Sequence, residues 1–424
     1  MRVLIVNTSE RTGGAAVAAN RLKDALNKHG EKAKMLVRDK ETDDITVVGL
    51  QRGFLSRWRF LWERWCIFVR LHFSRKHLFE IDIANMGHDI TSLREFKEAD
   101  VIHLHWVNQG MLSLQDIRKI LQSDKPIVWT MHDIWPATAI CHLSLGCHRF
   151  ENGCHHCKYL PGGGSQNDLS ATVWKRKQQI LEGQSLIFVA CSRWLAGEAK
   201  RSGLLKGQKV TVIPNPIDTS VFKKMDQLDA RKDLGLPEYK QFILFVSQRA
   251  TNVNKGMSYL EEACQKLVAA HPSMKETVAV IILGGHAEEV TDKLPIPAYP
   301  LGYVNDPHRI AQIYNAADMF VLPSLSENLP NTIMEAMACG VPCLGFKVGG
   351  IPEMIDHQKN GYVAQYRSSD DLATGLYWIL AEADHAALSA AAVQKVCREY
   401  SQHAVALRYS EIYNEAIAVK NYKL

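Results

Sequence analysis

Short runs of β-branched and other apolar residues alternate along this chain with longer helical patterns. The run at 3–6 is followed by Gly13 and Gly14 and then by a helical stretch at 15–28. Further strands are predicted at 101–104, 127–130, 186–189 and 210–213. Runs of this kind, joined by helices, are typical of parallel sheets with helical crossovers. The first half of the chain is therefore predicted to be a doubly wound α/β domain.

The same alternation begins again after the turn at 214–216. Its strands are predicted at 242–246, 278–283, 319–322 and 342–345. We therefore expect an α/β fold of two doubly wound, Rossmann-like domains, over residues 1–215 and 216–400. A helical pattern follows at about 401–418, and this helix is a candidate to pack back on the first domain.

Doubly wound sheets bind ligands beyond the carboxyl ends of their strands, at the point where the strand order reverses. Two such sheets that face each other would form a central cleft between the domains. That arrangement suits an enzyme with two substrates.

The composition is that of an ordinary globular chain, with 46% hydrophobic and 22% charged residues. A net charge of +5 over 424 residues is well below that of most nucleic-acid-binding proteins, so we expect no nucleic-acid partner. The first apolar run is too short for a secretory signal, and no stretch has the 18 apolar residues of a membrane span. These observations favour the cytoplasm.

Two cations and a glycine follow the first strand of the second domain. Arg249 lies at the end of that strand, and Lys255 comes six residues later, beside Gly256. A guanidinium offers a planar fork of donors and an ammonium a mobile point charge, so the pair suits a diphosphate. Taken alone, the pair is better explained as two surface cations on a solvated loop.

Two glutamates eight positions apart flank a predicted helix start. Glu327 lies on the loop after strand 319–322, and Glu335 lies in a helix that begins near Asn331, a residue type common at the N-cap. Amides at such a start can bind phosphate oxygens. A carboxylate in the helix suits ribose hydroxyls, and one on the loop suits sugar hydroxyls or a positive anomeric carbon. Alternatively, both are solvated acids that the helix dipole favours.

Together these segments resemble glycosyltransferase family 4, a retaining family with the two-domain GT-B fold. Arg249 and Lys255 match its donor-diphosphate contacts. The spacing of Glu327 and Glu335, and the sequence EAMACGVP at 335–342, match its signature. The resemblance extends over nearly the whole chain and implies a GT-B fold here.

The resemblance also implies roles for residues of the second domain. Glu335 would hold the nucleotide ribose, and Glu327 would lie near the transferred sugar and act in catalysis with Arg249 and Lys255. The backbone amides of Asn331 and Thr332 would meet the phosphates.

Gly13 and Gly14 separate the first strand from the first helix. They form either an ordinary tight turn or, by the resemblance, a flexible glycine loop near the donor phosphates. The pair is not a dinucleotide-binding fingerprint, because the pattern G-x-G-x-x-G is absent.

Two histidine-containing segments end strands of the first domain. His132 and Asp133 follow strand 127–130. The resemblance implies that His132 contacts the donor sugar, whereas a residue at this place is otherwise often part of the core. Asp133 would orient His132 or bind the acceptor. His103 and His105 alternate along a strand and look structural.

Four of the ten cysteines fall within 17 residues, at Cys141, Cys147, Cys154 and Cys157. Zinc takes four thiolate or imidazole ligands, and the C-x2-C pair is a common half-site. In a reducing compartment we favour a structural zinc over free thiols or disulfides. The pattern resembles a family 4 subgroup associated with bacterial surface polysaccharide synthesis.

The segment 52–77 combines cations with aromatic residues. Its seven basic residues are Arg52, Arg57, Arg59, Arg64, Arg70, Arg75 and Lys76, against the single acid Glu63. Its aromatic residues include Trp58, Trp62 and Trp65. Such a helix suits an anionic membrane interface, reached from the cytoplasm. Equally, it would pack on the first domain with its arginines extended into solvent. A lipid-linked acceptor, usual for the subgroup, would explain membrane contact.

The expected activity is transfer of a sugar from a nucleoside diphosphate, with uridine and guanosine both open, to a saccharide or lipid-linked saccharide. The product would be a bacterial capsule, exopolysaccharide or O-antigen, made with retention of anomeric configuration. No divalent cation is required by this scheme, and the chain has no Asp-x-Asp pair. The alternatives are a sugar-nucleotide epimerase of the same fold and a non-catalytic saccharide- or membrane-binding protein.

Overall fold

The computed structural model describes residues 1–50 and 54–421. Arg52, at the start of the basic and aromatic segment, lies outside the described residues. The chain divides into two compact units: unit 1 holds Met1–Pro216 and Val405–Leu424, and unit 2 holds Ile217–Ala404. Each unit is described by itself.

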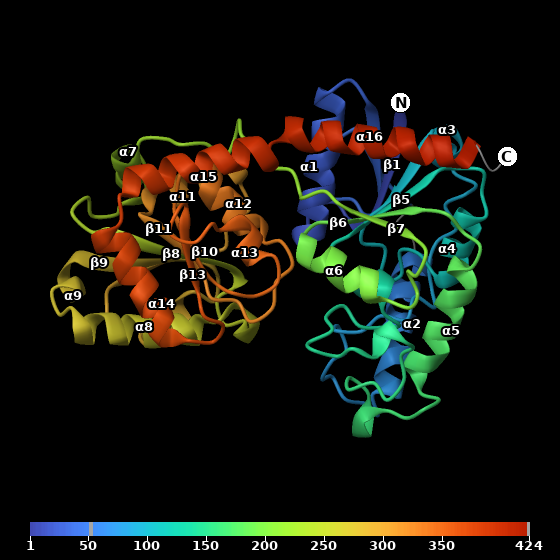
Figure 1. Cartoon of the computed structure of the whole chain (residues 1–424), viewed down its shortest axis with the longest axis horizontal. Helices are drawn as coiled ribbons and strands as arrows, with labels where there is room; N and C mark the ends of the chain where they lie inside the picture. The colour runs from blue at the N-terminus through green and yellow to red at the C-terminus, as the bar shows by residue number, and fades with distance from the viewer. Residues whose placement is uncertain (51–53, 422–424) are drawn as a thin grey trace. The chain divides into compact units, whose positions relative to one another are not determined.

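Unit 1 is built on a parallel sheet with the strand order β3-β2-β1-β4-β5-β6-β7 (Figure 1). Its strands are β1 (Arg2–Ser9), β2 (Lys32–Asp39), β3 (Val47–Gly49), β4 (Val101–Leu104), β5 (Ile127–Met131), β6 (Ile187–Ala190) and β7 (Lys209–Val212). Its helices are α1 (Gly14–Lys28), α2 (Phe54–Arg70), α3 (Arg94–Glu98), α4 (Leu114–Leu121), α5 (Leu169–Leu181), α6 (Arg193–Arg201) and α16 (Gln402–Asn421). Short 3₁₀ turns, η1 (Trp135–Ala137), η2 (Arg149–Glu151) and η3 (Pro161–Gly163), lie in the long connection after β5.

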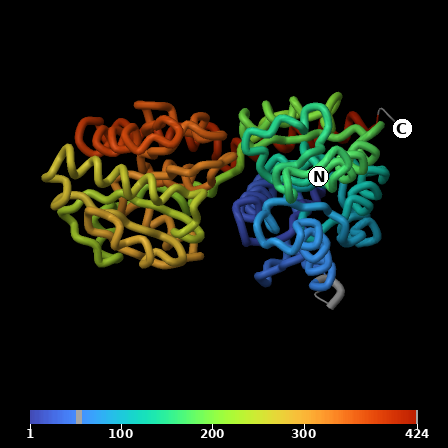
Figure 2. Tube along the Cα trace, turned by 90° about the horizontal axis from the view of Figure 1, so that it is seen from below, coloured from blue at the N-terminus to red at the C-terminus, as the bar shows by residue number. Residues whose placement is uncertain are grey.

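The C-terminal helix α16 completes the core of unit 1. Figures 1 and 2 both place the C-terminus on the unit that holds the N-terminus. Val405, Tyr409 and Tyr413 of α16 are buried against residues of β1 and α1 such as Ile5 and Leu22. The last segment of the chain is therefore part of the first sheet's packing.

Unit 2 is built on a second parallel sheet, with the order β10-β9-β8-β11-β12-β13. Its strands are β8 (Gln241–Arg249), β9 (Val278–Gly285), β10 (Ala298–Gly302), β11 (Met319–Leu322), β12 (Cys343–Phe346) and β13 (Gly361–Ala364). Its helices are α7 (Gln227–Leu234), α8 (Met257–Ala270), α9 (Met274–Thr277), α10 (Glu288–Thr291), α11 (Pro307–Ala316), α12 (Asn331–Ala338), α13 (Ile351–Met354), α14 (Ser369–Tyr377) and α15 (His385–Glu399). A 3₁₀ turn, η4 (Val253–Lys255), precedes α8, and a short π-helix, η5 (Trp378–Glu382), follows α14.

Helix starts follow from local sequence. A serine or aspartate side chain accepts a hydrogen bond from the first turn, which satisfies an amide that has no acceptor inside the helix. These N-caps are Ser113 of α4, Asp168 of α5, Ser192 of α6, Asp226 of α7, Asp306 of α11, Ser368 of α14 and Asp384 of α15.

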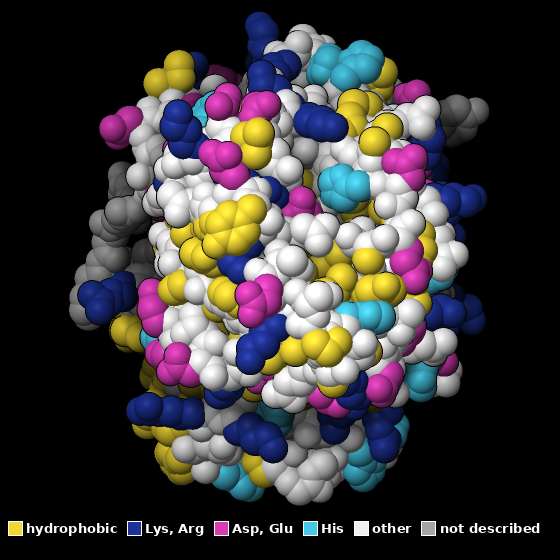
Figure 3. Space-filling model, turned by 90° about the vertical axis from the view of Figure 1, so that its left-hand side faces the viewer, with side chains coloured by type: hydrophobic (Ala, Val, Ile, Leu, Met, Phe, Trp, Pro, Cys, Tyr) yellow, Lys and Arg dark blue, Asp and Glu magenta, His cyan; other side chains and the backbone are white. Residues whose placement is uncertain are grey.

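The two sheets confirm the predicted α/β fold of two doubly wound domains. In the part of the chain that the structure describes, no helix combines the length and hydropathy needed to span a bilayer. On the face shown in Figure 3, acidic and basic side chains are interspersed.

Candidate active site

The strand order of unit 2 brings the predicted donor residues to one place. The chain leaves β8 for β9 and β10 on one side and returns to β11 on the other. The switch point thus lies between the carboxyl ends of β8 and β11, where a doubly wound sheet binds its ligand. Arg249 and Lys255 follow the first strand, and Glu327 follows the second.

Two glycines let the loops around this switch point touch through their backbones. Gly256 has φ +74°, and a Cβ there would lie 1.9 Å from the carbonyl oxygen of Pro323. Gly349 has φ +56°, and its Cβ would lie 1.7 Å from the carbonyl oxygen of Glu327. Only glycine fits at either position. The loops after β8, β11 and β12 consequently form one continuous surface.

Hydrogen bonds between the same loops fix their positions. The amide of Leu325 donates to the carbonyl oxygen of Asn254 over 2.8 Å. The amide of Gly350 donates to the carbonyl oxygen of Asn328, also over 2.8 Å. The side chain of Asn254 donates to the carbonyl of Ser326 over 3.0 Å. A site built on these loops is held in place before any ligand arrives.

Lys255 and Glu327 form an ion pair across this surface, from Nζ to Oε1. The exposed fractions of their side chains are 27% and 13%. The two residues were predicted to have separate roles, and their pairing was not predicted, because 72 residues separate them. The carboxylate holds the ammonium beside the switch point, where a diphosphate could replace it as the partner.

Arg249 is exposed at the end of β8, and its guanidinium lies 3.1 Å from Nε2 of His286. Nδ1 of His286 lies 2.6 Å from the carboxylate of Glu289. His286 was missed by the sequence analysis. The signal that could have found it is the sequence Gly284-Gly285-His286 at the carboxyl end of the neighbouring strand β9.

Helix α12 begins at Asn331, where its start was predicted, but its N-cap lies one residue earlier than predicted. Pro330 occupies the N-cap, and Asn331 is the first helical residue, so the prediction of Asn331 as the cap is corrected. A proline is suited to this place because its ring favours the extended conformation at the cap and it needs no amide partner. Asn331 and Thr332 therefore lie in the first turn, where helix amides lack acceptors within the helix.

Glu335 lies inside α12 and is 9% exposed. It accepts a hydrogen bond from the hydroxyl of Tyr314 on α11, over 3.1 Å. Burial and the nearby Glu335 raise the pKa of Tyr314 well above its usual value, so the hydroxyl stays a donor. Tyr314 was also missed, because nothing in the sequence links a helix tyrosine to a carboxylate 21 positions away.

The first sheet has its own switch point, between β1 and β4. Gly13 lies after β1 at φ +92°, with no atom within 4 Å of the place a Cβ would take. Its backbone conformation, rather than lack of space, requires glycine. Gly14 is the first residue of α1.

Three histidines form a chain behind this edge of the sheet. Nδ1 of His105 lies 2.9 Å from Nε2 of His132, and Nε2 of His105 lies 3.4 Å from Nδ1 of His103. Nδ1 of His103 also lies 2.8 Å from the hydroxyl of Tyr413, and its Nε2 lies 2.7 Å from the hydroxyl of Thr130. Burial lowers the pKa of His103 to about 3 and that of His132 to about 4, and that of His105 well below its usual value. All three are therefore neutral near pH 7.

Asp133 belongs to a separate network. Its Oδ2 accepts from Nε1 of Trp106 at 2.9 Å and lies 2.8 Å from Nδ1 of His142, and its Oδ1 accepts from the amide of Trp135 at 2.8 Å. Burial opposes ionisation of Asp133, but His142 and these bonds hold its pKa below the usual value. The same contact raises the pKa of His142 despite its burial. Asp133 is thus ion-paired to a histidine of the cysteine-rich segment.

The four clustered cysteines line one cavity of about 20 Å³. They are not joined as disulfides. Burial raises the pKa of Cys141 and of Cys154 to about 12. Within residues 1–50 and 54–421, no group of three or more His, Cys, Asp or Glu side chains is arranged to hold a metal ion.

Two family models match the chain. The model described as Glycosyltransferase Family 4 matches residues 12–221, and that described as Glycosyl transferases group 1 matches residues 240–382. An uncharacterised glycosyltransferase of Methanocaldococcus jannaschii is 24% identical over 72% of this chain and 81% of its own length. Alignments with two further curated relatives span 61% and 51% of those relatives.

Solved structures share the architecture. Sucrose-phosphate synthase of Thermosynechococcus elongatus has a TM-score of 0.67 at 19% identity, over 99% of both chains. Anabaena HepE, solved with UDP and glucose, has a TM-score of 0.63 at 17% identity, over 98% of this chain and 100% of that one. The fold and the family matches define a glycosyltransferase of the GT-B class. Within that class, the two models, which match residues 12–221 and 240–382, support a member of glycosyltransferase family 4.

These findings confirm the prediction of a transferase enzyme. The matched families and the first relative are glycosyltransferases, so the epimerase and non-catalytic alternatives are not supported.

Proposed function

We propose that this protein transfers a sugar from a nucleoside diphosphate, bound at the switch point of unit 2, to a hydroxyl of a saccharide or lipid-linked saccharide. The observation that carries the proposal is the joined surface of the loops after β8, β11 and β12, which gathers Arg249, Lys255 and Glu327 beside the start of α12. Anabaena HepE, which shares the fold, was solved with UDP, and this supports a nucleotide as the ligand here.

In this proposal Lys255 exchanges partners during the reaction. Without donor, its ammonium is held by Glu327. With donor, Lys255 and Arg249 bind the diphosphate, and Glu327 turns to the sugar. As the bond from the anomeric carbon to the diphosphate breaks, negative charge grows on the leaving oxygens. Donors that are already in place stabilise that charge at little cost of reorganisation.

The remaining donor contacts are assigned to α12. The amides of Asn331 and Thr332 meet the phosphates at the positive end of the helix dipole. Glu335 accepts the ribose hydroxyls, held in place by Tyr314. No divalent cation is required for any of these contacts.

Gly13, Gly14, His132 and Asp133 are proposed to serve the same reaction from unit 1. As a neutral imidazole, His132 would act by hydrogen bonding rather than as a cation. Asp133 would fix the acceptor side through its bonds to Trp106 and His142. Retention of anomeric configuration, a cytoplasmic location and a role in bacterial capsule, exopolysaccharide or O-antigen synthesis complete the proposal.

The proposal is tested first by a thermal-shift screen of uridine and guanosine diphosphate sugars, because a ligand that binds only the folded protein raises its unfolding temperature. The donor that gives the largest shift is then supplied in radiolabelled form with a bacterial lipid extract. We expect label in the lipid or saccharide fraction with wild-type protein and none with Glu335→Ala. Equal shifts for every nucleotide sugar and for glucose alone would contradict the proposal.

We further propose that Cys141, Cys147, Cys154 and Cys157 bind a structural zinc ion. Support comes from the cavity that the four thiols line together. Elemental analysis of purified protein should find about one zinc per chain. Cys141→Ser should lose it, and Cys397→Ser, at an exposed cysteine elsewhere, should keep it. Zinc well below half an equivalent in folded wild-type protein would end this proposal.

A further inference from the structure

Helix α2 of unit 1 carries its apolar side chains on the outside. Residues spaced by three or four positions form one face of a helix. On α2 and the turn after it, such a row is exposed, and we name it the α2 face: Trp58, Leu61, Trp62, Trp65, Val69 and Phe73. Trp65 is 51% exposed and Phe73 63%. Exposed apolar patches of this kind on a globular protein mark binding surfaces.

Charged residues fix the helix in this orientation. The opposite side of α2 carries Glu63 and Arg64, and both are buried. Arg64 pairs with Asp82 at 2.8 Å and donates to the carbonyl of Leu78 at 2.9 Å. Rotating α2 to bury its tryptophans would break this buried pair and leave Asp82 uncompensated, which is costly. The outward row is therefore built into the fold.

The exposed charge on residues 57–79, which form most of α2 and the segment after it, has one sign. Four cations are exposed in this range: Arg57, Arg70, Arg75 and Lys76. Between 57 and 79 the only acid is Glu63, which is buried. Aromatic and basic side chains on one face are suited to the surface of an anionic bilayer. A second copy of the same face would bring like charges together, so the charge favours a bilayer over a dimer.

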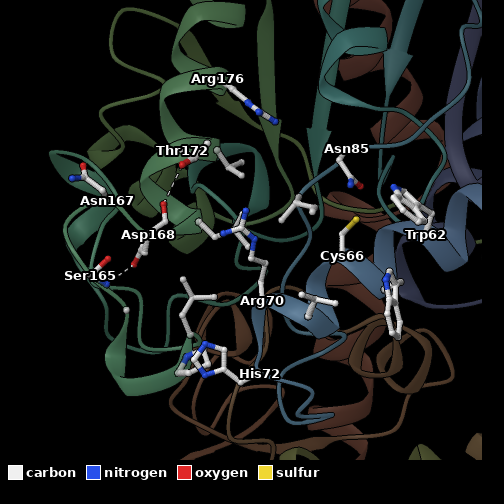
Figure 4. Close-up of a pocket in the computed structure, with 18 residues that line it drawn as sticks. Trp62, Cys66, Arg70, His72, Asn85, Ser165, Asn167, Asp168, Thr172 and Arg176 are labelled. Carbon is white, nitrogen blue, oxygen red and sulfur yellow. Dashed lines mark hydrogen bonds between the residues drawn. The ribbon is translucent and has the colours of Figure 1, made fainter.

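A cavity of about 790 Å³ opens beside the α2 face, between α2 and α5. Figure 4 shows Arg70 of α2 and Arg176 of α5 directed toward this space. Neither arginine has an ion-pair partner among residues 1–50 and 54–421. Asp168, on the rim, is occupied as the N-cap of α5 and by the amide of Cys157 at 2.9 Å. The available charge in the cavity is therefore cationic.

The cavity also holds a polar atom that needs a partner. The side-chain oxygen of Asn85 is buried and has no hydrogen-bond partner within the described part of the chain. Trp62 and Trp65 line the same space and belong to the α2 face. A ligand that fits has an anionic group for the arginines, a hydroxyl for Asn85 and an apolar part beside the tryptophans.

A phospholipid in a bilayer has all of these parts. We propose that the α2 face docks on an anionic lipid bilayer, with a lipid phosphate held by Arg70 and Arg176 in the adjoining cavity. The inference extends the proposed function, since docking would bring unit 1 to the surface where a lipid-linked acceptor resides. Bilayer binding is measured without any transfer reaction, so the docking inference and the proposed function can fail separately.

The test is co-sedimentation with vesicles of phosphatidylcholine alone or with about 30% phosphatidylglycerol. Wild-type protein should sediment with the anionic vesicles and far less with the neutral ones. Raising salt from about 0.1 M to about 0.5 M should release much of it, because screening weakens the cation contacts. Inorganic phosphate in excess should compete only weakly, because it lacks the apolar part.

Two variants separate the apolar contribution from the ionic one. The double variant Trp62→Ser/Trp65→Ser should lower partition to anionic vesicles by about tenfold or more. Arg70→Glu/Arg176→Glu should lower it by about fivefold or more per cation. The matched charge reversal Arg118→Glu, at an exposed residue of α4, should bind like wild type. Far-ultraviolet circular dichroism and thermal unfolding confirm that each variant is folded.

Three outcomes would overturn the inference. One is wild-type binding that does not depend on anionic lipid. Another is unchanged binding by both double variants. The third is release by inorganic phosphate as complete as that by salt, which would indicate a site for free phosphate. If vesicles fail to bind while nucleotide binding persists, the docking inference is wrong and the proposed donor site is untouched.

Discussion

The two sheets differ in the ionisable groups at the edge where the carboxyl ends of their strands lie. In unit 2, Arg249 is exposed and Lys255 is paired with the half-buried Glu327. In unit 1, His103 and His105 are buried, neutral and bonded to one another. One edge keeps charged groups that can exchange a protein partner for a ligand, and the other holds uncharged groups in a fixed network.

Under the proposed function, this difference shows how one fold type can serve two tasks. Binding a leaving diphosphate needs charge that is present before the reaction and accessible to the ligand. Fixing a neutral hydrogen-bonding group needs burial and satisfied partners, here the tyrosines that α16 contributes to unit 1. Because α16 supplies Tyr409 and Tyr413, the network of unit 1 is complete only when this helix packs on the first sheet.

The largest expected effect comes from removing the mobile charge of unit 2. Lys255→Ala should lower kcat/KM for transfer by about 10²–10³-fold, since in the proposed function it removes a donor to the leaving group. Initial rates with the donor found by thermal shift provide the measurement. Lys275→Ala, at an exposed lysine of α9, is the control. If Lys255→Ala lowers kcat/KM no more than the control Lys275→Ala does, Lys255 does not contribute to transfer.

The next effect concerns the backbone contact that holds the loops of unit 2 together. Gly256→Ala adds a Cβ that overlaps the carbonyl of Pro323, at φ +74°. Strain of about 1–2 kcal/mol and overlap of about 1–3 kcal/mol should both lower the free energy of unfolding. Gly235→Ala has a similar φ of +67° in open space and should show the strain alone. Urea denaturation compares them, and equal losses would mean that the contact with Pro323 is unimportant.

The third prediction tests the neutral histidines of unit 1 through pH. Their folded pKa values are lowered, to about 3 for His103 and about 4 for His132. Unfolded imidazoles bind protons below about pH 6.5, so the unfolded chain gains protons that the folded chain does not. The contribution of these histidines to the free energy of unfolding is therefore fully present above pH 6.5. It falls as the pH decreases toward 4, by about 1.4 kcal/mol per pH unit for each histidine.

The raised pKa of His142 acts in the opposite direction, because its ion pair with Asp133 is present at low pH and lost as pH rises. The contribution of His142 to the pH dependence of stability offsets only part of the opposite contribution of the three neutral histidines. Urea denaturation between pH 7 and pH 5 gives the slope, and His103→Asn should make it shallower by about one proton. An unchanged slope would show that His103 is not held neutral by the fold.

The smallest effects are expected from single hydroxyl groups. Tyr413→Phe removes a bond to His103 and should cost about 1 kcal/mol of stability, with nucleotide affinity unchanged. Tyr314→Phe removes a bond to the Glu335 carboxylate and should weaken nucleotide binding several-fold. Calorimetric titration and thermal unfolding of both variants separate the two. If Tyr413→Phe and Tyr314→Phe changed the affinity for the nucleotide equally, the proposed difference between the sheet edges of unit 1 and unit 2 would be wrong.

Much of the fold was predictable because buried parallel strands are short apolar runs. The strands that escaped prediction lack this signal. β2 places Lys32 and Lys34 on an exposed side, and β10 contains Pro300, which an edge strand tolerates because one edge of its backbone is unpaired. β13 is a short edge strand that begins with Gly361.

The order of residues along the chain pointed to the proposed donor residues, but it did not predict the contacts that these residues make in the structure. Spacing placed Glu327 and Glu335 on either side of a helix start. It could not show that Glu327 pairs with Lys255 or that Tyr314 supports Glu335, because those contacts depend on how strands and helices pack. Likewise, the composition of α2 was visible in the sequence, but its orientation depends on the buried pair of Arg64 with Asp82.

The central claim is that the switch point of unit 2 binds a nucleoside diphosphate through Lys255 and Glu335. Calorimetric titration of wild-type protein, Lys255→Ala, Glu335→Ala and the control Lys275→Ala with UDP and with GDP tests it most directly. We predict that wild type and control bind one of the two nucleotides equally well. Lys255→Ala and Glu335→Ala should bind it about tenfold or more weakly, as the loss of a charge-assisted hydrogen bond requires. Binding by both variants as tight as that of wild type would contradict the assignment of this site.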